Sequence, residues 1–242
     1  MPKSNDSNLH SALITGASRG LGLALARSLA LEHGLRVALV AREADPLYEA
    51  VAAIVAAGGE AVGIVADVGD KRAIHRIVGE ATAALGDIDL LINNASTLGP
   101  TPLRPLLDSE CEDFAAVLET NLLGPFRLSK ALLGSMVLRG RGLVVSISSD
   151  AAVEAYPDWG AYGVSKAALD HMTRIWAAEV AALGSPVRLL SIDPGEMDTR
   201  MHAEAIPDAD PSTLADPAAV GRRIAALILD GELSPSGVRR AA

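Results

Sequence analysis

The chain has 242 residues, half of them hydrophobic, which is enough to bury the core of one large domain. Thirty acidic residues against twenty-one basic ones give a formal net charge of −9, which argues against a broad nucleic-acid or anionic-membrane surface. No apolar run is long enough to span a bilayer, the five histidines show no metal-ligand spacing, and the one cysteine, Cys111, cannot form an internal disulfide. We therefore expect a cytoplasmic protein without a metal, a nucleic-acid partner or a membrane segment.

Strand-like apolar runs alternate with helical stretches along the chain. The runs are 11–15, 36–41, 61–66, 88–92, 143–148 and 187–192, and the helices are about 20–33, 46–57, 71–85, 110–139 and 161–183. Such alternation predicts right-handed βαβ units, and hence an α/β fold with a Rossmann-type doubly wound parallel sheet and helices on both faces.

We expect one dinucleotide-binding domain over residues 9–242, preceded by a polar, disordered segment 1–8. Residues 236–242 are a candidate for a last strand. Two helices have an aspartate before a proline, Asp45 before Pro46 and Asp216 before Pro217, which is typical of an N-cap followed by proline at the first helical position.

The first strand leads into a helix through a glycine-rich turn, Thr15-Gly16-Ala17-Ser18-Arg19-Gly20-Leu21-Gly22. Glycines let the backbone approach a pyrophosphate, and the helix N-terminus offers amide donors and a favourable dipole. The sequence therefore predicts a phosphate site made by Gly16, Ser18, Arg19, Gly20, Leu21 and Gly22. The alternative is an ordinary tight strand-to-helix turn.

The end of the second strand predicts which nicotinamide cofactor is used. Ala41 stands where an NAD enzyme would have a carboxylate for the adenosine ribose, and Arg42 follows it. Arg42 and Arg19 can pair with a 2′-phosphate, which favours NADP over NAD. Glu43 complicates this prediction because a shift of one or two residues would bring it to the ribose. The alternative for both arginines is a solvated surface.

The helix predicted over 110–139 contains Pro125, which removes the hydrogen bond that the carbonyl of Asn121 would accept in a continuous helix. We expect a kink there that leaves the Asn121 carbonyl free to hold a water, or else a mere helix break.

Tyr162 and Lys166 stand four residues apart, and Ser149 stands thirteen residues before the tyrosine. Four residues are about one helical turn, so the phenol and the ammonium project from the same helix face. A neighbouring ammonium lowers the pKa of a phenol, which would let Tyr162 exchange a proton with an alcohol or ketone near neutral pH. The alternative is a structural tyrosine–lysine pair.

Taken together, these motifs resemble the short-chain dehydrogenase/reductase family, most closely its carbonyl and 3-oxoacyl reductases. The matching pieces span most of the chain and are the glycine turn, Asp67-Val68, Asn93-Asn94-Ala95, Asn121, Ser149, Tyr162 with Lys166, and Asp193-Pro194-Gly195 with Thr199. Three departures from the family pattern stand out: Ser96 where glycine is usual, Asp193 where asparagine is commoner, and no Asp-Gly-Gly near the end.

The resemblance implies a role for each matching residue. Asp67 would bond the adenine amine, Val68 would pack on the ring, and Asn94 and Ala95 would run under the ribose. The segment of Pro194, Gly195, Met197 and Thr199 would hold the nicotinamide carboxamide. Ser149 would orient the substrate oxygen and Tyr162 would transfer its proton. Lys166 would lower the tyrosine pKa and bond the nicotinamide ribose, and the main chain of Asn121 would anchor a water that relays protons to Lys166.

The substrate pocket is expected to be lined by residues 96–98, 150–156, Trp159 and 196–202, with 196–215 as a mobile lid. We favour an NADP-dependent oxidoreductase of a small carbonyl or alcohol, with NAD as the alternative cofactor and a homodimer or homotetramer as the assembly. Two other hypotheses are a 3-oxoacyl carrier-protein reductase, disfavoured by Gly134 and Leu183 where docking arginines are expected, and a dinucleotide-sensing regulator without turnover.

Overall fold

The computed structural model describes residues 9–229 and 236–242, so the disorder predicted for residues 1–8 lies outside the described residues. Seven strands form one parallel sheet in the order β3-β2-β1-β4-β5-β6-β7. The strands are β1 (Ser11–Thr15), β2 (Arg36–Ala41), β3 (Ala61–Val65), β4 (Leu90–Asn93), β5 (Leu143–Ile147), β6 (Arg188–Asp193) and β7 (Arg239–Ala241).

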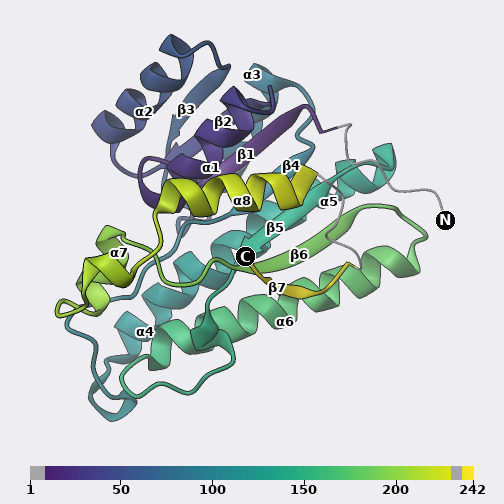
Figure 1. The fold of residues 1–242 in the computed structure, drawn as a ribbon. Helices are drawn as coiled ribbons and strands as arrows, with labels where there is room; N and C mark the ends of the chain where they lie inside the picture. Colours follow the sequence, from purple (N-terminus) through teal and green to yellow (C-terminus); the bar gives the residue numbers. More distant parts are fainter. Residues whose placement is uncertain (1–8, 230–235) are drawn as a thin grey trace.

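Helices cover both faces of this sheet (Figure 1). They are α1 (Gly20–Leu31), α2 (Ala44–Ala56), α3 (Ile74–Leu85), α4 (Cys111–Leu118), α5 (Gly124–Arg139), α6 (Gly160–Ala182), α7 (Arg200–Ala205) and α8 (Pro217–Leu229). The apolar sides of α1, α2 and α8 form one core with the sheet, and those of α3, α5 and α6 form a second core on the opposite face. The predicted doubly wound fold is therefore confirmed.

The strand residues divide between the two cores by simple alternation, because successive side chains of a strand point to opposite faces. In β1, Ala12 and Ile14 pack against the α1 side, whereas Leu13 packs against the α5 side. All three are fully buried. A strand buried on both faces has no polar alternation, which is why these segments read as continuous apolar runs in the sequence.

One of the two predicted helix caps is correct. Asp216 precedes α8, and its carboxylate accepts hydrogen bonds from the backbone amides of Ala218 and Ala219 at 3.0 and 3.3 Å. Asp45 is not a cap, because α2 begins at Ala44 and Glu43 precedes it. Pro46 is then the third helical residue, where it is tolerated because the first four amides of a helix have no intrahelical acceptor.

The helix predicted over 110–139 is interrupted between α4 and α5 by one π-helical turn, Glu119–Leu123. The expected distortion at Asn121 and Pro125 is thus present, since proline has no amide hydrogen to continue the α-helical pattern. The side chain of Asn121 is buried within this turn.

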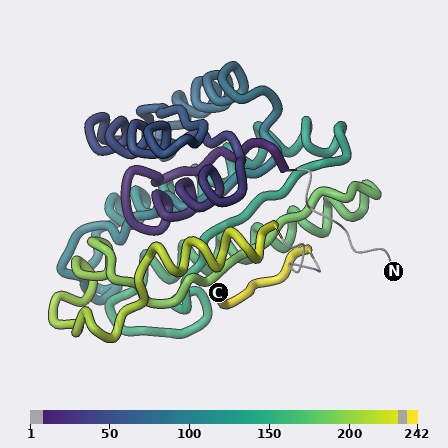
Figure 2. Tube along the Cα trace, turned by 45° about the horizontal axis from the view of Figure 1, so that its top comes forward, coloured from purple at the N-terminus to yellow at the C-terminus, as the bar shows by residue number. Residues whose placement is uncertain are grey.

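The candidate strand at 236–242 is confirmed as β7, which pairs in parallel with β6 at the edge of the sheet (Figure 2). Ser191 of β6 lies opposite Arg239, and Asp193 lies opposite Ala241. This pairing brings residues close to the end of the chain alongside the carboxyl end of β6. Among the described residues, no helix is long and apolar enough to cross a membrane.

Candidate active site

A cavity of about 1160 Å³ opens at the carboxyl ends of the strands. The strand order reverses between β1 and β4, and such a switch point leaves a crevice between the loops that follow the strands. The glycine turn, the segment after β4, the segment after β5 and the start of α6 all line this one cavity. Except for Asn121, the predicted cofactor and catalytic residues therefore line one cavity, although Gly16 and Thr199 are 183 residues apart in the chain.

Backbone geometry explains two of the glycines in the turn before α1. Gly16 has a φ of +64°, a conformation that side chains rarely adopt, and a Cβ there would lie 2.8 Å from the Cα of Ala95. A Cβ on Gly22 would lie 2.3 Å from the carbonyl oxygen of Gly16. Any larger residue at position 22 would push the turn open, so these glycines keep the backbone close to the cavity.

Thr15, which we did not predict as a site residue, ties this turn to the end of β4. Its hydroxyl accepts hydrogen bonds from the backbone amides of Asn94 and Ala95, each at 3.0 Å. The Asn94 side-chain amide donates to the carbonyls of Thr15 at 2.8 Å and Gly16 at 3.1 Å. The predicted ribose segment is thus fixed to the glycine turn by hydrogen bonds, and the position of Thr15 directly before the first glycine is the sequence signal for it.

The two predicted phosphate-binding arginines differ in their contacts. Arg19 forms an ion pair of 2.6 Å with Glu43, and both side chains are largely exposed. Arg42 is exposed and lines the cavity, and it forms no ion pair with any residue that the structure describes. Glu43, the residue that complicated the cofactor prediction, therefore lies against a cation. Asp67 accepts a hydrogen bond from the amide of Gly69 at 2.8 Å, and Val68 is buried; both line the cavity.

Ser149, Tyr162 and Lys166 all line this cavity. Tyr162 and Lys166 occupy successive turns at the start of α6 and are 8% and 2% exposed. The Lys166 ammonium donates to the carbonyl of Ile147 at 2.8 Å and lies 5.5 Å from the centre of the Tyr162 ring. Ser149 follows β5, and its hydroxyl donates a hydrogen bond to the Asp150 carboxylate at 3.0 Å.

The pKa of Tyr162 runs against the expectation from the sequence. Burial raises this pKa to about 12, and Asp150 and Asp193 add to the rise, while hydrogen bonding from the Ser149 and Ser96 hydroxyls opposes it. Burial also lowers the pKa of Lys166 to about 8, against the fields of Asp170 and Asp193. The predicted lowering of the phenol pKa is therefore wrong, because burial removes the solvent that would stabilise the phenolate.

Asn121 does not line the cavity, but its side chain contacts Thr97, which does. Its amide oxygen accepts from the Thr97 amide at 2.8 Å, and its amide nitrogen donates to the Thr97 carbonyl at 2.8 Å and to the Ser165 hydroxyl at 2.9 Å. Ser165 in turn donates to the carbonyl of Tyr162 at 2.6 Å. Asn121 thereby joins the segment after β4 to the start of α6.

The loop after β6 closes the other side of the cavity. Pro194, Gly195, Met197 and Thr199 all line it, and the Thr199 hydroxyl accepts from the amide of His202 at the start of α7. The segment 196–215 folds back on itself, and the backbone amide of Asp198 donates a hydrogen bond to the carbonyl of Ala215 at 3.0 Å. Most residues expected to face substrate line the cavity, namely 96–98, 150, 151, Tyr156, Trp159 and 196–202, whereas 152–155 do not.

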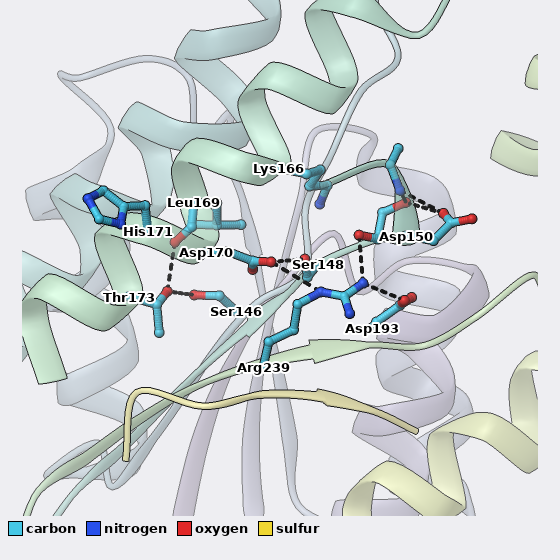
Figure 3. A network of polar contacts seen from close by, with 12 residues as sticks. Ser146, Ser148, Asp150, Lys166, Leu169, Asp170, His171, Thr173, Asp193 and Arg239 are labelled. Atoms are coloured by element: carbon cyan, nitrogen blue, oxygen red, sulfur yellow. Dashed lines mark hydrogen bonds and ion pairs between the residues drawn. The ribbon is translucent and has the colours of Figure 1, made fainter. Parts of the chain in front are cut away.

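Two charged residues next to the site were not predicted from the sequence (Figure 3). Asp170 lies one helical turn after Lys166, a spacing that indicates the same helix face. Arg239 of β7 donates to Asp193 at 2.7 Å, so the carboxylate at this position has a cationic partner. Nothing local in the sequence pairs Arg239 with Asp193, because the pairing depends on how β7 joins the sheet.

The model of the family described as short chain dehydrogenase matches residues 10–210. A short chain dehydrogenase of Pseudocercospora fijiensis is 36% identical over 195 residues, which are 79% of this chain and 61% of the relative. The chain therefore spans less than two thirds of that relative's length.

Solved structures resemble the whole chain. An actinorhodin polyketide ketoreductase variant with NADPH has a TM-score of 0.87 at 27% identity, covering 98% of this chain and 96% of the other. A 7α-hydroxysteroid dehydrogenase with NADH and 7-oxo-glycochenodeoxycholic acid has a TM-score of 0.88 at 26% identity, covering 100% and 96%.

Proposed function

Because this chain belongs to the short chain dehydrogenase family of oxidoreductases, we propose that it reduces a small ketone or aldehyde with NADPH, or runs the reverse alcohol oxidation. One observation carries the proposal: Ser149, Tyr162 and Lys166 lie in the same cavity as the glycine turn. The close approach of Gly16 and Gly22 leaves a cradle that a Cβ would fill, so the chain's own backbone fits a bound pyrophosphate.

The preference for NADPH over NADH rests on charge at the far end of the cavity. Among the described residues Arg42 has no ion-pair partner, whereas Arg19 is held by Glu43, and Ala41 supplies no carboxylate for a ribose hydroxyl. The two similar solved structures contain NADPH in one case and NADH in the other, so these side chains, rather than the shared fold, support the choice. A tenfold preference corresponds to about 1.4 kcal/mol, a modest contribution for charge-assisted contacts.

In this proposal the protein positions the carbonyl and supplies its proton. The bound nicotinamide would supply the hydride. The Ser149 hydroxyl donates a hydrogen bond to the substrate oxygen and stabilises the charge that develops there. Tyr162 donates its proton to that oxygen, and a pKa of about 12 keeps the phenol protonated until then.

Lys166 stabilises the phenolate left after proton transfer. Its ammonium is held by the Ile147 carbonyl within 5.5 Å of the phenol ring, and it is predominantly charged at neutral pH because its pKa is about 8. The same ammonium would also reach the ribose hydroxyls of the cofactor. The side chain of Asn121 holds the segment at Thr97 against the start of α6. Its main chain would anchor the water that returns a proton to Lys166.

The shape of the pocket supports a compact substrate with an apolar part. Leu98, Trp159 and Tyr162 pack together, and Met201 and Ala205 from the segment 196–215 pack against them. We propose that this segment is the lid that closes over the substrate. The 3-oxoacyl carrier-protein hypothesis ranks lower, because an acidic carrier needs basic docking residues and the chain has Gly134 and Leu183 at the expected positions.

The test follows NADPH absorbance with cyclohexanone, ethyl 3-oxobutanoate and a 3-oxoacyl thioester, using wild type and Tyr162→Phe. We expect oxidation of NADPH by wild type, and a fall of about 10² to 10⁴ in rate for Tyr162→Phe with NADPH affinity nearly unchanged. A phenylalanine variant that keeps more than about a tenth of the turnover would contradict the role of Tyr162. Tight NADPH binding without turnover of any compound in a wider panel would favour the regulator instead.

We also propose a homodimer or homotetramer in the cytoplasm. For the assembly, α6 presents exposed apolar side chains at Val164 and Ile175. For the compartment, Cys111 is a free, exposed thiol, which suits a reducing environment. Light scattering during size-exclusion chromatography measures the assembly directly. A monomer at micromolar concentration would contradict it.

A further inference from the structure

Arg239 extends from β7 to contact Asp170 and Asp193 (Figure 3). Its terminal Nη2 donates to the Ser149 carbonyl at 3.0 Å and to Asp193 Oδ2 at 2.7 Å, and its Nε lies 3.3 Å from Asp170 Oδ2. The side chain is 27% exposed. One guanidinium therefore contacts the segment after β5, the end of β6 and helix α6 at once.

Each of the three contacts leads to a part of the site. Ser149 is the residue whose hydroxyl faces Tyr162, so fixing its carbonyl fixes the backbone that carries the hydroxyl. Asp193 also accepts from the amide of Gly195 at 3.0 Å and thereby holds the turn that lines the cavity. Asp170 lies one turn after Lys166 and accepts from the Ser148 hydroxyl at 2.8 Å.

The charges in this region also link Arg239 to Lys166. Asp170 and Asp193 are the two carboxylates whose fields favour the ammonium form of Lys166. Their side chains are 9% and 13% exposed, so solvent screens them poorly. Arg239 and Lys166 together balance the two negative charges. Without Arg239, both carboxylates would face the one remaining ammonium.

We propose that Arg239 is a positioning residue for the reaction, which holds Ser149 and the turn at Asp193 in place and balances the carboxylates beside Lys166. This inference rests on the proposed roles of Ser149, Tyr162 and Lys166. Arginine suits the task because its planar fork contacts several oxygens at once, which an ammonium on a flexible stem cannot do.

The groups around Lys166 set the direction of the expected pKa change. Asp170 and Tyr162 face it from α6, the Ile147 carbonyl from β5, Asp193 from the end of β6, and Arg239 stands behind both carboxylates. Removing the guanidinium leaves the negative field of the carboxylates less compensated. The pKa of Lys166 therefore rises in Arg239→Gln, and it falls in Asp193→Asn.

The experiment compares Arg239→Gln and Arg239→Lys with wild type. The matched control is Arg139→Gln, which removes a guanidinium of 21% exposure that donates to the Ile88 carbonyl and pairs with Asp87. Those partners precede β4, at the amino ends of the strands, whereas the cavity lies at the carboxyl ends. Turnover is followed with ethyl 3-oxobutanoate and NADPH. The pKa of Lys166 is measured by NMR of selectively labelled lysine, which the chain allows because it contains only four lysines.

We expect kcat to fall by about tenfold or more in Arg239→Gln, since small displacements of a positioned group are costly in rate. Arg239→Lys should restore the pKa of Lys166, because it restores the charge, while kcat stays reduced because the three contacts are not all remade. Arg139→Gln should change neither quantity. If Arg239→Gln does not fold, Asp193→Asn removes the same ion pair from the other side and should lower the pKa of Lys166.

The inference is overturned if Arg239→Gln loses no more turnover than Arg139→Gln, or if the pKa of Lys166 is the same as in wild type. Tyr162→Phe in the same assay separates this outcome from a failure of the proposed function. An inactive Tyr162→Phe beside a fully active Arg239→Gln contradicts the role of Arg239 alone. An active Tyr162→Phe contradicts the proposed mechanism itself.

Discussion

Replacing Lys166 by methionine should stabilise the protein while it abolishes turnover. Lys166 is 2% exposed and charged at neutral pH, and burial lowers its pKa from 10.5 to about 8. Methionine is similar in size and carries no charge to desolvate. The lysine is therefore a residue whose function costs stability, as is common where a site needs a buried charge.

The magnitude follows from the two pKa values. Each pKa unit corresponds to 1.36 kcal/mol, so a lowering from 10.5 to about 8 means that the buried charge costs roughly 3 kcal/mol. Loss of the hydrogen bond to the Ile147 carbonyl removes about 1 kcal/mol of that gain. A stabilisation of about 2 kcal/mol at neutral pH is left for Lys166→Met.

The dependence on pH has a definite sign. Between pH 8 and 10.5 the unfolded lysine still binds its proton while the folded one has lost it, so the free energy of unfolding of wild type rises with pH. Lys166→Met lacks this rise, so its advantage should be full below pH 8 and shrink toward pH 10.5.

Urea unfolding of both proteins at pH 7 and at several higher values measures the difference. A variant less stable than wild type at pH 7, or a difference that does not change with pH, would refute the reasoning. The first result would mean that Asp170 and Asp193 compensate the buried charge more fully than we infer.

Three further changes test other parts of the structure. Glu43→Gln should free Arg19 and tighten NADPH binding by about two- to fivefold without affecting NADH, measured by fluorescence titration; an equal change for both cofactors would argue against a contact with the 2′-phosphate. Gly22→Ala should lower the Tm and weaken binding of both cofactors, because its Cβ would lie 2.3 Å from the Gly16 carbonyl. Asp216→Ala should cost about 1 kcal/mol through loss of the cap on α8, which calorimetry would detect as a Tm lower by about 2–4 °C.

Much of the fold and the site could be predicted from the sequence because the determining features are local. Alternating apolar runs define the strands and helices, and the alternation itself indicates a parallel sheet. Tyr162 and Lys166 share a helix face because they are four residues apart, and Pro125 predicts the interruption at Asn121 because it lacks an amide hydrogen. The glycine turn is equally local, since its conformation depends on residues that follow one another.

Only the tertiary structure decided which distant charges meet and how far each is removed from water. The pairing of β7 with β6 places Arg239 against Asp193 and Asp170, and the arrival of α2 beside the glycine turn places Glu43 against Arg19. The pKa of Tyr162 is raised rather than lowered because packing around α6 excludes solvent. Desolvation and long-range ion pairs depend on the assembled sheet and its helices, so no spacing within the sequence expresses them.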